Sequence, residues 1–132
     1  MKKQNLQNKY PVFSIEIEKK ECVKSNVKEI LNFLKSRIEE HPVAQFISIF
    51  DHYSHTKKME EGEIATDILA AEVILFCFGK KLETPLQLAV RPRPIGIAEM
   101  KESFVISFLE APNPVFNEVM EKWIKSLIKE EK

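Results

Sequence analysis

The densest hydrophobic run of the chain covers residues 73–78 and ends at Gly79. An uninterrupted run of six apolar residues, rich in aromatic and β-branched types, is typical of a strand that is buried on both faces. We therefore predict a central, fully buried strand at this position and expect the other elements to pack around it.

An alternating pattern predicts a second strand near the N-terminus. Over residues 12–18, Phe13, Ile15 and Ile17 alternate with serine and glutamate, which places apolar side chains on one face of a strand and polar ones on the other. Lys101-Glu102 interrupts two apolar segments and predicts a tight hairpin. Further strands are predicted at residues 44–53, 95–100 and 103–109.

Two long segments have the spacing of amphipathic helices, with apolar residues at intervals of three and four. The first follows Asn26, a capping residue with Glu29 three positions later, and ends before Pro42. The second follows Asn113-Pro114, because a capping residue before a proline marks a helix start. Thr84-Pro85 has the same pattern and predicts a short helix. The two long stripes are Val27, Ile30, Leu31, Leu34 and Ile38, and Phe116, Val119, Met120, Trp123, Ile124 and Leu127.

The predicted order of elements is strand, helix, four strands, helix. This order favours an α+β fold of two layers, in which an antiparallel sheet carries two long helices packed on one face. We expect residues 10–132 to form a single domain and the polar residues 1–9 to form a disordered N-terminal tail. Residues 54–62 are predicted to be a charged loop, and residues 64–71 a short helical turn.

Composition and charge restrict the classes of partner. Twenty basic residues balance twenty acidic ones, which removes the overall electrostatic argument for nucleic acid or an anionic membrane. The polar start of the chain does not have the apolar core of a secretory signal, and no apolar run is long enough to span a bilayer. Because two cysteines are too few for a disulfide scaffold, we expect a cytoplasmic protein. Cys77 is expected in the core and Cys22 at the surface.

Four short motifs occur together in a known order. They are a strand end at Phe50-Asp51-His52, an apolar strand that closes on Phe78-Gly79, a turn into a helix at residues 82–86, and Arg93-Pro94 before a hairpin. In these motifs the chain resembles the bacterial "domain of unknown function 302" family, over about residues 12–128.

That resemblance implies a fold similar to the TATA-binding-protein class and a homodimer, because members of the family are often dimers. It implies no activity. The chain also departs from the family pattern, since Lys80-Lys81 stands where the family prefers Asn-Pro, and Glu83 where it prefers glycine.

Asp51, His52 and His55 are a candidate polar site. An aspartate can orient a histidine for acid–base catalysis, and His52 and His55 could bind a metal if the chain turns after Tyr53. Cys77, from another strand, is the candidate third ligand. The alternative, which we prefer, is a pair of strand-end histidines that bond only to backbone or water, because neighbouring residues on a strand point to opposite faces.

Arg91, Arg93 and Thr84 are a candidate ligand site. Two guanidiniums held between prolines can grip a carboxylate or phosphate, and the helix start at Thr84 adds backbone N–H groups that favour an anion. Lys80 and Lys81 would add a basic rim. The alternative is a solvated loop without a ligand.

These patterns predict a small non-catalytic module that binds an anionic or apolar small molecule, or a partner protein, and that forms a homodimer. The alternative is a metal-dependent or acid–base enzyme that uses Asp51, His52 and His55. The cofactor is unknown: the three glycines fit no phosphate-binding loop.

Overall fold

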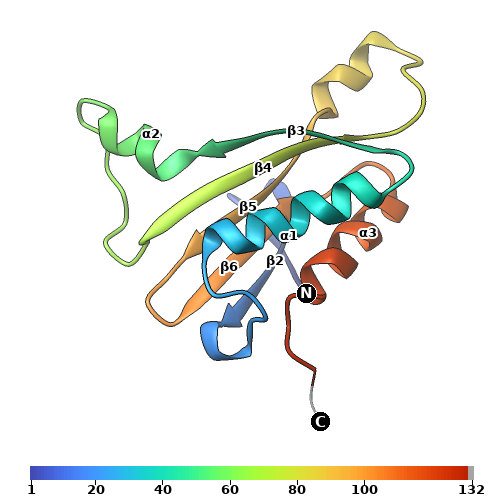
Figure 1. The fold of residues 1–132 in the computed structure, drawn as a ribbon. Coiled ribbons are helices and arrows are strands. Elements are labelled where there is room, and N and C mark those ends of the chain that lie inside the picture. The colour runs from blue at the N-terminus through green and yellow to red at the C-terminus, as the bar shows by residue number, and fades with distance from the viewer. Residues whose placement is uncertain (131–132) are drawn as a thin grey trace.

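Six strands form one antiparallel sheet in the computed structural model, which describes residues 1–130 (Figure 1). Their spatial order is β1-β2-β6-β5-β4-β3. The α+β class and the antiparallel sheet are therefore confirmed. The strands are β1 (Lys2–Leu6), β2 (Tyr10–Glu18), β3 (Ala44–Asp51), β4 (Ala70–Phe78), β5 (Arg93–Glu99) and β6 (Ser103–Leu109). The helices are α1 (Val27–Glu40), α2 (His52–Lys58) and α3 (Pro114–Lys125), with the short 3-10 turns η1 (Lys19–Glu21) and η2 (Pro85–Val90).

Both long helices begin at the predicted caps. The side chain of Asn26 accepts a hydrogen bond from the Glu29 amide at 2.9 Å, and the Glu29 carboxylate accepts one from the Ser25 amide at 2.9 Å. At α3, the Asn113 side chain accepts from the Val115 amide at 3.0 Å. These bonds satisfy amides that have no partner within the helix, so they fix where each helix starts.

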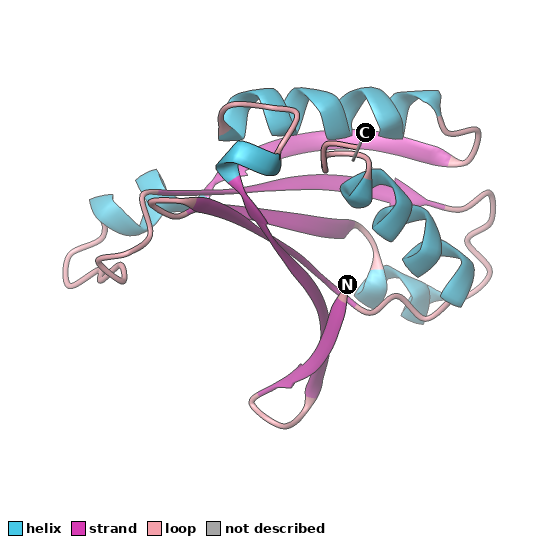
Figure 2. Ribbon diagram, turned by 90° about the horizontal axis from the view of Figure 1, so that it is seen from below, coloured by secondary structure: helices cyan, strands magenta, loops and turns pink. Residues whose placement is uncertain are grey.

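One hydrophobic core lies between the sheet and the two long helices. Antiparallel pairing sets Ile74 opposite Ile95, and Ile97 opposite Ile106, so these side chains share one face of the sheet. The buried residues of α1 and α3 belong to the same core, and Figure 2 shows α1 and α3 on the same side of the sheet. No helix among residues 1–130 is both long and apolar enough to cross a membrane.

Strand β4, which was predicted to be a central strand buried on both faces, differs from that prediction. Ile74, Phe76 and Phe78 are buried, but Val73 and Leu75 on the opposite face are only half-buried. The reason is that neither long helix covers this second face (Figure 2). We call it the open face. Its middle carries half-buried small and apolar residues, among them Ser14, Val73, Leu75, Cys77, Gly96, Ala98, Val105 and Ser107, and its β2 end carries the exposed Glu16 and Glu18.

The N-terminal residues expected to be a disordered tail form strand β1 instead. It pairs with β2 from Lys2, opposite Ser14, to Leu6, opposite Tyr10, and all five of its residues are exposed. The connecting turn, residues 7–9, has positive φ values of 54° at Gln7 and 58° at Asn8, which are typical of tight hairpin turns. Backbone pairing and the ion pair of Lys3 with Glu110, at 2.7 Å, hold this strand without apolar burial, so it leaves no hydrophobic pattern in the sequence.

The segment after β3 also corrects the prediction. The strand ends at Asp51 rather than at residue 53, and α2 begins at once with no buried residue. Residues 64–69 form no helix. Strand β3 gives way to α2 at Asp51 because the Asp51 side chain accepts a hydrogen bond from the Ser54 amide at 2.9 Å and thereby caps the helix.

Cys22 is buried, contrary to its prediction, with 4% of its surface exposed. The segment after α3 covers Cys22. The Val23 amide donates to the Leu127 carbonyl at 2.8 Å, and the backbone of Cys22 forms an isolated β-bridge with that of Ile128.

Candidate functional site

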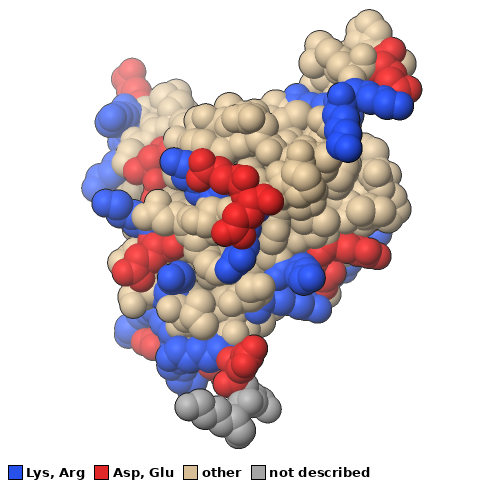
Figure 3. Space-filling model, turned by 45° about the vertical axis from the view of Figure 1, so that its right-hand side comes forward, with Lys and Arg blue, Asp and Glu red and all other residues tan. Residues whose placement is uncertain are grey.

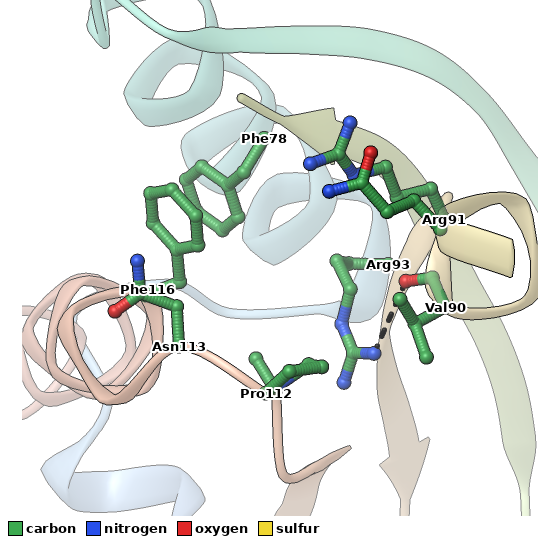
Figure 4. A pocket seen from close by; sticks show the side chains of 9 residues that line it. Phe78, Val90, Arg91, Arg93, Pro112, Asn113 and Phe116 are labelled. Carbon is green, nitrogen blue, oxygen red and sulfur yellow. Dashed lines mark hydrogen bonds between the residues drawn. The ribbon is translucent and has the colours of Figure 1, made fainter. Parts of the chain in front are cut away.

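A cavity of about 270 Å³ opens at one end of the core, where segments distant in the sequence meet. They are the end of β4, η2, the start of β5, the loop before α3 and the first turn of α3. Nine residues line the cavity: Phe78, Gln87, Val90, Arg91, Arg93, Ala111, Pro112, Asn113 and Phe116. Figure 4 shows the rings of Phe78 and Phe116 on one side and the side chains of Arg91 and Arg93 on the other. We call this cavity the arginine pocket.

The aromatic side of the arginine pocket is rigid. The rings of Phe78 and Phe116 stack with centroids 4.3 Å apart and planes within 1° of parallel. Phe78 also stacks on Trp123 of α3, with centroids 5.6 Å apart. A stacked set held from both β4 and α3 offers a flat apolar wall.

Arg93 is the central polar residue of the pocket, and only 6% of its surface is exposed. Its Nη1 donates to the Val90 carbonyl at 3.3 Å, its Nη2 donates to the Leu109 carbonyl, and its Nε has no partner. Within residues 1–130, no carboxylate forms an ion pair with Arg93. Burial lowers the pKa of this guanidinium. A buried charge without a counter-ion is costly, so the site favours an anion from outside.

Arg91 is fixed beside Arg93 in the same pocket. Its Nη1 donates to the Lys81 carbonyl at 2.6 Å. Its guanidinium passes close to Gly79, where an added Cβ would lie 3.1 Å from Nη2. The chain between β4 and β5 therefore holds the second guanidinium in place through its backbone.

The two side-chain amides of the pocket, those of Gln87 and Asn113, present mainly donors. The Gln87 Oε1 already accepts from the Glu83 amide at 2.6 Å and the Thr84 amide at 3.3 Å. The Asn113 Oδ1 already accepts from the Val115 amide. The remaining NH₂ group of each amide is a donor, as are both guanidiniums. The pocket therefore suits a ligand that accepts hydrogen bonds.

Thr84 lies outside the residues that line the pocket. The amides at the start of η2, which were expected to bind an anion, instead donate to the Gln87 side chain. Lys80 and Lys81 do not line the pocket either. They precede an exposed apolar projection around η2, in which Leu86 is 82% exposed (Figure 3).

Asp51, at the C-terminal end of β3, and His52 and His55, in α2, are all exposed. Both carboxylate oxygens of Asp51 accept from Ser54, each at 2.9 Å, and these bonds lower the pKa of Asp51. The rings of His52 and His55 have centroids 6.1 Å apart, and His52 Nδ1 bonds to the Thr56 hydroxyl at 2.9 Å.

The described residues bring no third ligand to the two histidines, since residues 1–130 contain no group of three metal-ligating side chains placed to hold an ion. Cys77 pairs with Gln45, whereas Asp51 pairs with Glu72 at the far end of the same two strands. Five residues of strand separate the two places, roughly 17 Å.

A comparison with protein-family models matches residues 1–129 to a family of unknown function (DUF6858). The chain belongs to this family. No curated protein and no solved structure matches the chain. The resemblance drawn from the sequence is thus confirmed at the level of a family of unknown function, while the numbered family that was named for it is not confirmed.

In this DUF6858 member the structure brings Arg91 and Arg93 together, and it adds Phe78, Phe116, Gln87 and Asn113, which the sequence patterns had assigned to the core, a turn and a cap. One overlooked signal could have found the burial of Arg93. Arg93, Ile95 and Ile97 alternate with small residues, so the arginine belongs to the buried face of its strand.

Proposed function

We propose that this DUF6858 protein binds a small anionic ligand with an apolar part in the arginine pocket, and that it catalyses no reaction there. The observation that carries the proposal is the buried Arg93 guanidinium, which has no carboxylate partner among residues 1–130. The nine lining residues include no carboxylate, imidazole, thiol or hydroxyl group, so the pocket offers donors for binding but no general base or nucleophile.

The test is a calorimetric titration with small carboxylates and inorganic phosphate at constant ionic strength. Arg93→Met should abolish binding. Arg93→Met removes an unpaired buried charge but also removes the donors to the Val90 and Leu109 carbonyls, so the two effects on stability oppose each other, and thermal unfolding must show that the variant is folded. Arg37→Met, in an exposed arginine of α1, is the matched control and should bind as the natural protein does. Unchanged binding in folded Arg93→Met would contradict the proposal.

We also propose that the protein forms a homodimer through the open face. This face is supported by its half-buried apolar residues and by the absence of a long helix over it among residues 1–130. Strands β2 to β6, about 4.8 Å apart and about 20 Å long, make a flat area on the order of 500 Å². This area is below the size of a standard interface, so we expect a weak dimer.

Light scattering at increasing protein concentration tests the dimer. Leu75→Glu places a charge on the open face and should yield a monomer, whereas Leu86→Glu, on the projection, should remain dimeric. A natural protein that is monomeric at all concentrations, or a dimer disrupted by Leu86→Glu alone, would rule out this interface.

Two finer features belong to this proposal, and one alternative to it has less support. The TATA-binding-protein-like arrangement, with two long helices on one face, is supported by the shared core of α1 and α3. Two free cysteines support a cytoplasmic location. The metal-dependent or acid–base alternative at Asp51, His52 and His55 has less support because Asp51 is engaged as a helix cap. Stoichiometric metal uptake that is lost in His52→Ala would favour that alternative.

A further inference from the structure

The size of the arginine pocket restricts its ligand. A cavity of about 270 Å³ has the volume of about nine liquid water molecules, since each occupies about 30 Å³. A ligand with one small ring and one acid group is of this size.

The polar groups restrict the charge of the ligand. Arg91, Arg93, Gln87 and Asn113 present mainly N–H donors, because backbone amides already bond to both amide oxygens. A neutral amine, alcohol or amide would bring a donor for which the lining offers one side-chain acceptor, the second lone pair of Asn113 Oδ1. A carboxylate brings acceptors only, and its two oxygens match the planar donor pairs of a guanidinium.

The walls restrict the shape of the ligand. Five of the lining residues are apolar: Phe78, Val90, Ala111, Pro112 and Phe116. Phe78 is enclosed between Phe116 and Trp123 and is only 2% exposed, so the half-buried ring of Phe116 supplies the aromatic surface, on which a planar ring makes closer contact than a puckered one. The apolar surroundings also favour one negative charge over two, because each added charge increases the cost of desolvation.

From these three restrictions we infer that the ligand is a monocyclic aromatic monocarboxylate. Its carboxylate faces Arg91 and Arg93, and its ring packs against Phe78 and Phe116. This inference rests on the proposed anion-binding function and adds the chemical class of the ligand.

Four probes test the inference on the full chain, each titrated by calorimetry at constant ionic strength. Benzoate has the charge and the flat ring, benzamide has the ring without the charge, cyclohexanecarboxylate has the charge with a puckered ring, and inorganic phosphate has charge without a ring. Benzoate should bind best. Benzamide should bind at least about tenfold more weakly, because hydrogen bonds to a charged group are worth more than neutral ones.

Amide chemical shifts from NMR locate the binding and keep the test independent of folding defects. Benzoate should move the signals of residues 87–93 and 111–117. Phe116→Leu should reduce the preference for benzoate over cyclohexanecarboxylate, while the control Phe33→Leu, on α1, should keep it.

The outcomes separate the two claims. If cyclohexanecarboxylate or phosphate binds as tightly as benzoate, the aromatic class is wrong and the anion-binding function stands. If benzamide equals benzoate, or if benzoate moves signals elsewhere, the inference is also overturned. If no anion binds, the proposed function itself fails.

Discussion

The rings of Phe78 and Phe116 lie parallel, 4.3 Å apart between centroids, and join the last residue of β4 to the first turn of α3. This stack closes one end of the core and forms the aromatic side of the arginine pocket. The packing of the core and the lining of the pocket therefore depend on the same pair of side chains.

Phe116→Leu should lower the free energy of unfolding by about 0.5–1.5 kcal/mol, because it removes the ring stack but keeps an apolar side chain. Urea denaturation measures the change. Phe33→Leu is the control, since Phe33 is a half-buried phenylalanine of α1 that stacks on no aromatic ring and contacts Arg37 instead. Equal losses in both variants would show that the stack adds nothing beyond apolar burial.

Asn117→Ala should destabilise the protein by about 1–3 kcal/mol, because buried backbone groups lose their partners. Asn117 is 9% exposed, its Oδ1 accepts from the Ala111 amide at 2.7 Å, and its Nδ2 donates to the Ala111 carbonyl at 3.2 Å. Since these bonds hold the loop that lines the pocket, ligand affinity should fall as well. Thermal unfolding and calorimetry measure the two effects.

The exposed Asn32→Ala in α1 is the control for that variant. It should be neutral or slightly stabilising, because alanine has the higher helix propensity. A loss in Asn117→Ala no larger than that in Asn32→Ala would mean that the Ala111 loop is held by other contacts.

Gly79→Ala should destabilise by about 1–2 kcal/mol, because Gly79 has a φ of +112° that side chains rarely adopt. Its new Cβ would also lie 3.1 Å from Nη2 of Arg91 and displace that side chain, so ligand affinity should fall. Gly96→Ala is the matched control in β5, where the nearest atoms to an added Cβ are 3.9 Å away. It should be neutral or stabilise by about 0.4–1 kcal/mol. Denaturant midpoints that rank the two variants in the reverse order would contradict this account.

Glu72→Gln should stabilise the protein at neutral pH. Burial, and secondly the charge of Asp51 on the neighbouring strand, raises the pKa of Glu72 above its ordinary value of 4.5. A raised pKa means that the folded state binds the proton more tightly than the unfolded state does. The stability from Glu72 is therefore complete below pH 4.5 and is lost as the pH rises through the folded-state pKa.

At neutral pH the neutral glutamine should gain about 0.2–1 kcal/mol, the usual cost of like charges directly opposite on neighbouring strands. The gain should disappear below pH 4.5, where the natural carboxyl group is itself protonated. Urea midpoints across this range measure the gain. The exposed Glu39→Gln serves as control, and a gain that grows toward acid pH would reverse the assigned sign.

Much of the secondary structure could be predicted from residue patterns. Asn26 with Glu29, and Asn113 with Pro114, marked both long helices, because capping is a local interaction between residues a few positions apart. The hairpin of β5 and β6 followed from the polar Lys101-Glu102 between two apolar runs. The residue pattern gave a wrong prediction at Asp51. The apolar residues before it predicted a longer strand, whereas its side chain ends the strand by capping a helix.

The sequence by itself determined which residues carry apolar stripes, where the helices begin, and that two arginines lie close together at the start of β5. Only the tertiary structure decided that Arg93 is buried without a counter-ion among residues 1–130, that Phe78 and Phe116 stack beside it, and that one face of β4 stays uncovered. The physical reason is distance along the chain. Caps and stripes depend on residues within about one helical turn, whereas a pocket and a covered face depend on which distant segments the packing brings together.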